Sequence, residues 1–230
     1  DDHAAQDPGR RAREVIERLA LAHGACVIAA IGDGDAGLDA ALARLAPDEQ
    51  ARALALAPVR RRDYVAGRTA LHAALGSPVA VRSDDRGAPV LPVGWVGSVS
   101  HKAGLAAALV APAGQGHVGI DLEVAAPPRS DIARRVLTPR ELATLDGLDP
   151  VARGRAVTLR FSIKEAVYKA IDPYVRRYVG FLEVELDFQD ALDPALGELA
   201  VSTALPFAID ARWREHAGHW LATARAVPRR

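Results

Sequence analysis

Residues 117–124 read HVGIDLEV, and this stretch is the most informative part of the sequence because apolar residues occupy every second position. The alternation is typical of a β-strand with one apolar face, and it places Asp121 and Glu123 together on the opposite face. Two carboxylates on one face can converge on a hard cation such as Mg²⁺. They can also form the solvated outer face of a half-buried sheet, so the strand alone leaves both interpretations open.

The stretch FSIKEAVYKA, residues 161–170, predicts a helix in which one carboxylate stands between two amines. Glu165 and Lys169 would share a face as an i,i+4 pair, which stabilises an exposed helix by about 0.2–0.5 kcal/mol. The same pattern suits a phosphate site, because Mg²⁺ held by a few carboxylates usually also takes phosphate oxygens and these need cations nearby. Lys164 and Lys169 are candidates for that role.

Helical and strand patterns occur in both halves of the chain, which predicts an α+β fold of two lobes. The Pro-rich segment AAPPRS marks the joint, so we expect an N-terminal lobe over 1–124 and a C-terminal lobe over 125–230. Helices are expected at 9–21, 38–45, 47–55, 60–75 and, with one break, 131–172; strands are expected at 26–31, 95–100, 104–111, 117–124, 181–188, 206–213 and 219–226.

Composition excludes several classes of function. Lys and Arg together number 29, as do Asp and Glu, so the zero net charge argues against a broad nucleic-acid surface. The single cysteine, Cys26, cannot form an internal disulfide or a multi-cysteine metal site. No apolar run is long enough to span a bilayer and the acidic opening DDHAAQ is not a signal peptide, so we expect a soluble, cytoplasmic protein without a membrane partner.

Two further segments carry groups that suit phosphate. GSVSHK, residues 97–102, places Ser100 and His101 at the end of a predicted strand, although a histidine near a turn can simply be solvated. In RRRDYVAGR, Arg60 and Arg68 stand about two helical turns apart and can point the same way. Arginines of an arginine-rich chain are also often only solvated.

The segment GDGDAG, residues 32–37, suggests an alternative function. It fits G-x-G-x-x-G after an apolar run, as in a nicotinamide-dependent oxidoreductase. Asp33 and Asp35 would however face a pyrophosphate with negative charge, and no second strand ending in an acidic residue follows at the required distance.

The motifs in order resemble the Sfp-type 4'-phosphopantetheinyl transferases, nearest to the siderophore-synthase-activating bacterial branch. They are RRRDYVAGR, RGAP, GSVSHK, GIDLE, FSIKEAVYK and PYVRRYVGF, which together span residues 60–181. The resemblance implies two similar lobes related by a pseudo-twofold axis, with the active site in the cleft between them, and a monomer. It also implies transfer of the phosphopantetheine arm of coenzyme A to a serine of an acyl or peptidyl carrier protein, with release of 3',5'-ADP.

The resemblance implies a role for each motif residue. Asp121, Glu123 and Glu165 would hold Mg²⁺, Glu165 would also be the base, and Lys169 would neutralise charge on the pyrophosphate. The residues implied to bind coenzyme A are Arg60, Arg68, Arg86, Gly87, Pro89, Ser100, His101, Lys164 and Lys169.

The sequence departs from the family pattern at Lys102, where a small residue is frequent, and at Ala88. Whether Lys102 adds a phosphate contact is left open. A non-catalytic module that only binds carrier proteins is a further alternative, although such a module would have no need of an acidic triad.

Overall fold

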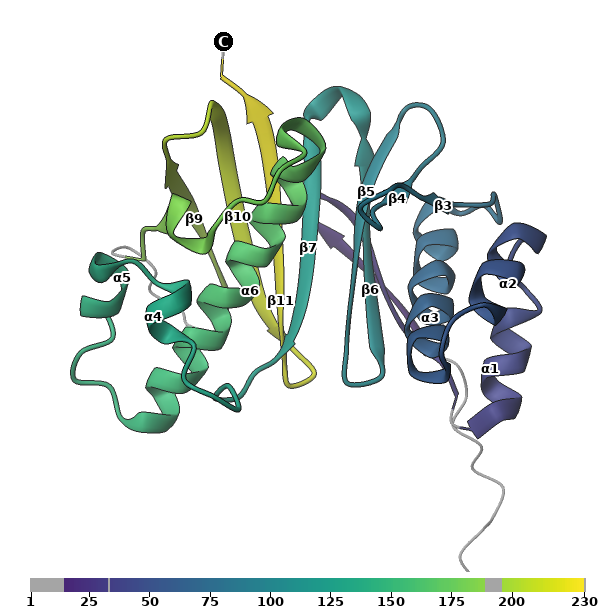
Figure 1. Cartoon of the computed structure of the whole chain (residues 1–230), viewed down its shortest axis with the longest axis horizontal. Coiled ribbons are helices and arrows are strands. Elements are labelled where there is room, and N and C mark those ends of the chain that lie inside the picture. Colours follow the sequence, from purple (N-terminus) through teal and green to yellow (C-terminus); the bar gives the residue numbers. More distant parts are fainter. Residues whose placement is uncertain (1–14, 33, 189–195, 230) are drawn as a thin grey trace, which may run out of the picture.

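A computed structural model describes residues 15–32, 34–188 and 196–229, which form two α+β lobes side by side (Figure 1). The sheet of the N-terminal lobe has the strand order β1-β2-β6-β5, and the sheet of the C-terminal lobe has the order β7-β11-β10-β9-β8. The strands are β1 (Val15–Leu21), β2 (Gly24–Ala30), β5 (Trp95–Lys102), β6 (Leu105–Pro112), β7 (His117–Val124), β8 (Val184–Leu186), β9 (Leu196–Thr203), β10 (Phe207–His216) and β11 (His219–Pro228), with a small ribbon of β3 (Arg82–Ser83) and β4 (Pro89–Val90).

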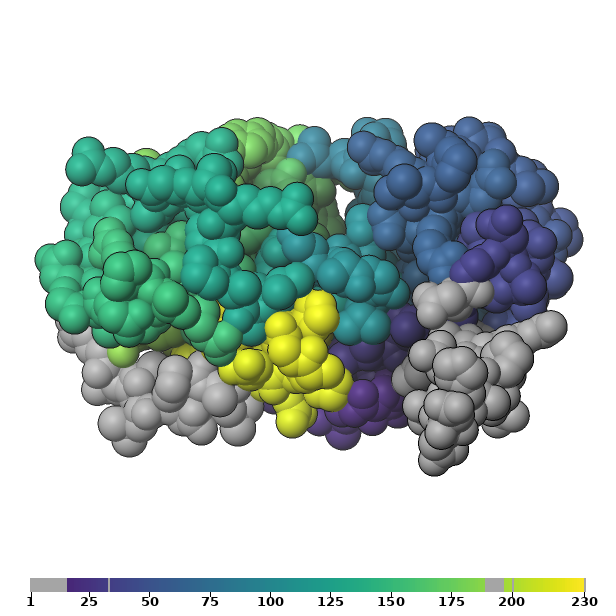
Figure 2. All heavy atoms as spheres, turned by 90° about the horizontal axis from the view of Figure 1, so that it is seen from below, coloured from purple at the N-terminus to yellow at the C-terminus, as the bar shows by residue number. Residues whose placement is uncertain are grey.

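One long helix packs against each sheet, α3 in the N-terminal lobe and α6 in the C-terminal lobe (Figure 1). Seen from below, the yellow atoms of the C-terminal part of the chain lie at the junction between the two lobes (Figure 2). The helices are α1 (Gly34–Leu42), α2 (Pro47–Leu54), α3 (Pro58–Leu75), α4 (Ala133–Val136), α5 (Pro139–Ala143) and α6 (Pro150–Val175), with short 3₁₀ turns η1 (Ala113–Gln115) and η2 (Phe181–Glu183).

Helix α6 has clear local signals at both ends. Asp149 caps its start by accepting hydrogen bonds from the backbone amides of Val151 and Ala152, and Pro150 occupies the first turn, where no amide donor is needed. The helix ends at Val175, because the next residue, Arg176, adopts a left-handed φ of 47° that breaks the repeat. These signals fix the register of the helix that carries Glu165.

Strand β7 lies directly against α6 because of one glycine. A Cβ atom added to Gly119 would collide with the backbone carbonyl of Ala166 and approach the backbone amide of Ala170. Only glycine permits so close an approach of strand and helix. The glycine of the GIDLE motif therefore brings the two neighbouring acidic positions of β7 next to α6.

The other face of β7 is apolar, as the alternation predicts, and it joins the two lobes. Its side chains pack in a core between the two sheets, which limits how far the lobes can move relative to each other. That core contains Val118, Ile120 and Leu122 of β7 together with Cys26, Ile28, Val96, Ala107, Leu109, Ala111 and Leu221.

Three expectations from the sequence need correction. Of the helix expected at 9–21, residues 9–14 lie outside the described residues, and Val15–Leu21 form strand β1, which pairs with β2 along its whole length. Its side chains pack on the core between the lobes, which overrides the helical pattern. Strand β9 was not expected at all, and the strand expected over 181–188 is limited to β8, preceded by η2.

The boundary between the lobes also differs from the expected 124/125. Strand β7 pairs with β11, so it belongs to the sheet of the C-terminal lobe. We therefore propose a boundary in the connection at residues 113–116 instead.

The topology excludes the dinucleotide-binding interpretation of GDGDAG. Strand β2, which precedes this segment, is antiparallel to both of its neighbours, whereas a dinucleotide fold needs parallel strands. Gly37 has a packing role, because a Cβ atom at this position would collide with the backbone of Gly32. Asp33 lies outside the described residues.

Among the residues that the structure describes, no helix is both long enough and apolar enough to cross a membrane.

Candidate active site

Asp121 lies at the centre of the candidate site and is almost fully buried. Its carboxylate accepts hydrogen bonds from Ser100 Oγ of β5 and Ser162 Oγ of α6, both at 2.9 Å, and from Lys169 Nζ at 2.8 Å. Lys169 also donates to the carbonyl of Ile120 at 3.0 Å. The strand face that carries Asp121 is therefore turned to α6 and away from bulk solvent, which excludes the interpretation of a solvated outer face for this residue.

Ser100 links the two lobes. Its hydroxyl donates to Asp121 and also accepts a hydrogen bond from the backbone amide of Leu122 at 3.2 Å. With 7% of its surface exposed, Ser100 holds β5 against β7, so the structure gives it a positioning role in addition to any phosphate contact.

Glu123 lies two residues further along β7 and is nearer to solvent. Its Oε2 is 2.6 Å from Nζ of Lys102, which belongs to the N-terminal lobe. The neighbouring His101 is half exposed and its Nδ1 lies 3.5 Å from Oδ2 of Asp63. His101 thus remains accessible to a ligand, and Asp63 is a neighbour that the sequence motifs did not indicate.

Glu165 completes the acidic group from the side of α6. Burial raises the pKa of Glu165, the negative charges of Asp121 and Glu123 raise it further, and Lys169 opposes the rise. Each of these effects except the last disfavours the ionised form. The site therefore concentrates negative charge that a bound cation would relieve.

Lys164 does not face this acidic group, contrary to the expectation from the motif. Its ammonium is buried, donating to Glu141 Oε2 at 2.7 Å, to the carbonyl of Val136 at 2.8 Å and to the carbonyl of Phe181 at 3.0 Å. Since all three donor positions of the ammonium are used, Lys164 ties α6 to α4, α5 and η2. This placement corrects the expectation that Lys164 binds coenzyme A phosphates.

Arg68 is also buried and engaged. Its Nη2 donates to Ser83 Oγ at 2.8 Å, its Nε lies 3.6 Å from Oε1 of Glu49, and its guanidinium stacks on the ring of Tyr64. Arg60 of the same helix is exposed. The two arginines therefore stand in different environments, and only Arg60 is open to solvent.

The loop between β3 and β4 reaches across to the C-terminal lobe. Arg86 forms a close ion pair with Asp172 of α6, at 2.7 Å from Nη2 to Oδ1, and donates to the hydroxyl of Tyr168 at 2.8 Å. Gly87 follows with a φ of 86°, which completes the turn before Pro89. This loop, residues 86–89, is called the nucleotide loop below because the resemblance implies that it borders the nucleotide of coenzyme A. It is anchored one turn of α6 beyond Lys169, and Tyr168 and Asp172 are partners that the sequence pattern alone did not reveal.

The carboxylates of Asp121, Glu123 and Glu165 are chemically suited to a hard cation, although two of them contact lysines. Across residues 15–32, 34–188 and 196–229, no three His, Cys, Asp or Glu side chains form a ready-made metal site. The carboxylates of Asp121 and Glu123 instead contact Lys169 and Lys102. Carboxylate oxygens are ligands that Mg²⁺ accepts, and the mutual repulsion acting on Glu165 shows that these three groups share one electrostatic environment.

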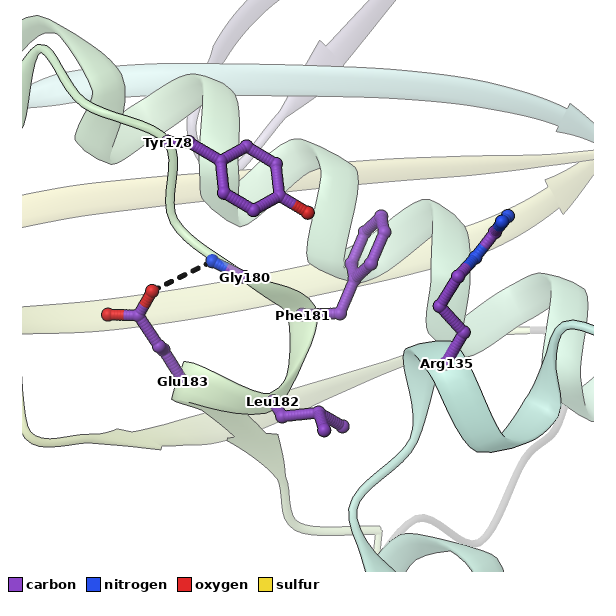
Figure 3. Close-up of a pocket in the computed structure, with 6 residues that line it drawn as sticks. All are labelled: Arg135, Tyr178, Gly180, Phe181, Leu182 and Glu183. Atoms are coloured by element: carbon purple, nitrogen blue, oxygen red, sulfur yellow. Dashed lines mark hydrogen bonds between the residues drawn. The ribbon is translucent and has the colours of Figure 1, made fainter.

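A pocket of about 550 Å³ lies on the C-terminal lobe, between α4 and the segment around η2 (Figure 3). The carbonyl of Phe181 on its wall accepts from Lys164, the neighbour of Glu165, and the ring of Phe181 packs 5.5 Å from that of Phe161. Tyr178 and Leu182 are exposed at its rim. The pocket is lined by Arg135, Tyr178, Gly180, Phe181, Leu182 and Glu183.

Comparisons with known proteins point to one family. The model of the 4'-phosphopantetheinyl transferase superfamily matches residues 117–224, and the model of the 4'-phosphopantetheinyl transferase N-terminal domain matches residues 48–111. The 4'-phosphopantetheinyl transferase Svp of Streptomyces mobaraensis is 35% identical over 170 residues, covering 70% of this chain and 67% of Svp. The 4'-phosphopantetheinyl transferase Npt of Nocardia iowensis is 36% identical over 135 residues, covering 56% of this chain and 60% of Npt.

The match to Npt thus spans less than two thirds of that relative. A crystal structure of a holo-(acyl-carrier-protein) synthase from Bacillus anthracis in complex with coenzyme A is similar at 21% identity and a TM-score of 0.38, covering 49% of this chain and 96% of that chain. Both family models match in order and the structure brings their motifs on β7 and α6 together, so the chain belongs to the 4'-phosphopantetheinyl transferase superfamily.

Proposed function

We propose that this protein transfers the phosphopantetheine arm of coenzyme A to a serine of an apo carrier protein, with Mg²⁺ and with release of 3',5'-ADP. The observation that carries the proposal is the grouping of Asp121, Glu123 and Glu165 on the facing sides of β7 and α6, with Lys169 against Asp121. Family membership supplies the class of reaction, and this geometry supplies groups for each part of it.

The chain would use its carboxylates in two ways. Asp121, Glu123 and Glu165 would hold the cation, which when bound would neutralise charge on the pyrophosphate of coenzyme A. Glu165 would also take the proton of the acceptor serine, directly or through a water molecule, since it faces the same site from α6.

The transfer step balances with these groups. The serine oxygen forms a bond to the phosphorus that carries the pantetheine arm, and the bond from that phosphorus to the bridging oxygen breaks. The released 3',5'-ADP takes the electron pair of the broken bond, and Lys169 stabilises its growing charge. Lys169 is already oriented by Asp121 and by the carbonyl of Ile120, so little reorganisation is needed.

Coenzyme A would lie between the two lobes. His101 is open to the ligand, Arg60 is solvent-exposed and Arg86 holds the nucleotide loop against α6. We propose that these side chains, with Arg68, Gly87, Pro89 and Ser100, contact its phosphates and nucleotide.

The carrier protein would dock on the C-terminal lobe. Arg134 and Arg135 are exposed on α4, and Arg135 lines the pocket beside the exposed Tyr178 and Leu182 (Figure 3). A basic and apolar surface of this kind suits an acidic carrier domain. Charge reversal at both arginines should raise the KM for the carrier while leaving the KM for coenzyme A unchanged; an unchanged KM for the carrier would remove this surface from the proposal.

We further propose a cytoplasmic monomer with no nucleic-acid or membrane partner, since zero net charge and a single-chain site agree with it.

The intact mass of an apo carrier protein tests the proposed reaction. The carrier is incubated with coenzyme A, Mg²⁺ and the protein, and parallel samples contain a chelator or the Glu165→Gln variant. We expect a gain of one phosphopantetheine in the complete sample and none in either control. A folded protein that modifies none of several unrelated carriers would instead favour a module that only binds them.

A further inference from the structure

Lys102 occupies an unusual place at the edge of the candidate site. It is the last residue of β5, and the turn that follows is fixed by Ala103 and Gly104, with φ angles of 49° and 83°. This tight turn gives Lys102 a defined direction, because both turn residues adopt the left-handed conformation of a two-residue hairpin. Lys102 therefore projects from the N-terminal lobe at a fixed point beside β7.

The ammonium of Lys102 contacts a carboxylate of the other lobe. Its Nζ lies 2.6 Å from Oε2 of Glu123, with 43% of the lysine side chain and 16% of the glutamate side chain exposed. The long, flexible stem of lysine and its partial exposure allow the ammonium to leave this position without disturbing the fold. The contact is thus movable, unlike the buried pair of Lys164 and Glu141.

A divalent cation bound to Glu123 would lie close to the ammonium of Lys102. Both are positive and both need the carboxylate oxygens, so a cation that binds Glu123 must repel or displace the ammonium. The displaced ammonium then needs a new anion. If the proposed function is correct, the phosphates of coenzyme A provide that anion at the same place.

We propose that Lys102 competes with the divalent cation for Glu123 and, once displaced, binds a phosphate group of coenzyme A. The cation and coenzyme A then bind cooperatively, because a phosphate of coenzyme A pairs with the ammonium that the cation displaces from Glu123. The inference rests on the proposed function and adds to it a residue whose position in the motif departs from the usual small side chain.

His101 cannot take this role, although it is adjacent. Successive residues of a strand point to opposite faces, and the His101 ring lies near Asp63 rather than Glu123. Lys169 is bound to Asp121 and to a backbone carbonyl, so it has partners that do not depend on Glu123. The coupling that acts through Glu123 is therefore assigned to Lys102.

Binding of Mg²⁺ measured by titration calorimetry tests the inference without turnover. Mg²⁺ is titrated into the protein alone and into the protein saturated with coenzyme A, with no carrier present. Lys102→Ala should lower the Kd for Mg²⁺ alone by about two- to fivefold, the range expected from one exposed ion pair. The same variant should reduce the tightening of Mg²⁺ binding by coenzyme A, whereas Lys102→Arg should behave as the wild type.

A reciprocal titration provides a second check. Thermodynamic linkage requires that Mg²⁺ change the affinity for coenzyme A by the same factor, so Lys102→Ala must reduce both factors equally. Unchanged Mg²⁺ affinity and unchanged cooperativity in Lys102→Ala would overturn the role of Lys102 while the wild type still modified a carrier. A wild type that binds coenzyme A but no Mg²⁺ in either titration would overturn the proposed metal site as well.

Discussion

Strands β7 and β2 hold corresponding places in the two lobes, yet only β7 carries acidic residues. Each pairs with the second strand of a hairpin, β7 with β11 and β2 with β6, and each lies beside the long helix of its lobe. In the C-terminal lobe, Asp121 pairs with Ala222 and Glu123 pairs with Trp220. In the N-terminal lobe, Val27 pairs with Ala108 and Ala29 pairs with Ala106, which lie at the same distances from their hairpin turn.

The two hairpins that set this correspondence have the same turn. Ala103–Gly104 joins β5 to β6 and Ala217–Gly218 joins β10 to β11, and all four residues have positive φ. The partners of the first residues after these turns are Ala30 and Val124. Val27 and Ala29 therefore correspond to Asp121 and Glu123.

A buried glutamate marks a second correspondence. Glu49 accepts from the backbone amides of Ala46 at the start of α2 and of Val81 beyond α3. Glu141 accepts in the same way from the amides of Thr138 at the start of α5 and of Leu186 beyond α6.

Each glutamate also faces a cationic side chain of its long helix. Arg68 of α3 lies near Glu49, and Lys164 of α6 pairs with Glu141. With Arg68 matched to Lys164, Thr69 corresponds to Glu165 and Ala73 corresponds to Lys169. The N-terminal lobe therefore repeats the scaffold but has apolar or neutral residues at all four chemical positions.

This difference separates the motif residues that hold the fold in both lobes from those proposed to perform the chemistry. Lys164 lies in the most recognisable motif and has a scaffold role shared with the other lobe. Its direct neighbour Glu165 has no acidic counterpart in the N-terminal lobe. We therefore expect the functional residues to be those that differ between the corresponding positions of the two lobes.

Replacing Glu165 by the residue of the other lobe should have the largest effect. Glu165→Thr removes the proposed base and one cation ligand, so we expect transfer to fall by about 10²–10⁴-fold, the usual contribution of a positioned base. The matched control is Thr69→Val, which should leave the rate unchanged. Both are checked by carrier mass at early time points, and a comparable loss in Thr69→Val would contradict the assignment of chemistry to one half.

Removing the buried cationic side chain should lower the free energy of unfolding more in the C-terminal lobe than in the N-terminal lobe. Lys164→Ala leaves Glu141 buried without its ammonium partner, so we expect unfolding free energy to fall by about 3–5 kcal/mol. Both glutamates keep their backbone donors, but Arg68→Ala should cost less, about 1–3 kcal/mol, because Glu49 also keeps a hydrogen bond with His72 at 3.1 Å.

Urea unfolding at neutral pH measures both variants. Burial alone would raise the pKa of Glu49, but hydrogen bonds from His72 and the backbone outweigh it and hold the pKa below its usual range. Glu49 is thus stabilised as an anion by several donors. Equal losses in the two variants would show that the correspondence between the pairs extends to their energetics as well as their geometry.

Much of this arrangement was predictable from the sequence because it depends on local pattern. The period of two in β7 predicted that Asp121 and Glu123 share a face, and the helical spacing placed Glu165 on the same helix as Lys169. The facing of this strand and helix depends on Gly119, whose packing role is a tertiary feature.

Other features could not be predicted because they depend on partners far apart in the sequence. Lys164 pairs with Glu141 across 23 positions, and Arg86 reaches Asp172 across 86. The sequence pattern predicts a helix over residues 9–21, but pairing with β2 in the sheet makes Val15–Leu21 a strand. The resemblance to a family indicated which residues matter, and the structure separates those that form the scaffold from those that face the site.

A third prediction concerns pH and has a smaller effect on stability. Because burial and the charges of Asp121 and Glu123 raise the pKa of Glu165 in the folded protein, folding favours its protonated form. The stabilising contribution is full below the unfolded pKa of about 4.3 and is lost as pH rises through the raised folded value. Without cation, Glu165→Gln should therefore melt about 2–4 °C above the wild type near pH 8, corresponding to about 1 kcal/mol.

The difference in melting temperature should shrink as pH falls through the raised pKa of Glu165, since the wild-type carboxyl then becomes neutral like the amide. Added Mg²⁺ should raise the wild-type melting temperature and have less effect on Glu165→Gln. Differential scanning calorimetry at several pH values measures all three effects. A variant that melts lower than the wild type at pH 8 would mean that Glu165 is stabilised as an anion, against the repulsion inferred here.

The smallest expected effect comes from the contact that corresponds to Lys102–Glu123. His216 stands before the second hairpin turn, where Lys102 stands before the first, and its Nε2 lies 2.9 Å from Oε2 of Glu17 on β1. The added strand β1 supplies the carboxylate that Ala29 of β2 lacks. Both contacts join the hairpin of one lobe to the sheet of the other.

If only one of these contacts serves the proposed chemistry, His216→Gln should cost less than about 1 kcal/mol and leave Mg²⁺ binding and transfer unchanged. Lys102→Ala should change Mg²⁺ binding with a similarly small effect on stability. Urea unfolding and Mg²⁺ titration of the two variants side by side make the comparison. His216 contacts Glu17 and none of the three carboxylates proposed to hold the cation. A change in Mg²⁺ affinity in His216→Gln would therefore show that both contacts act on the cation site through the packing between the lobes.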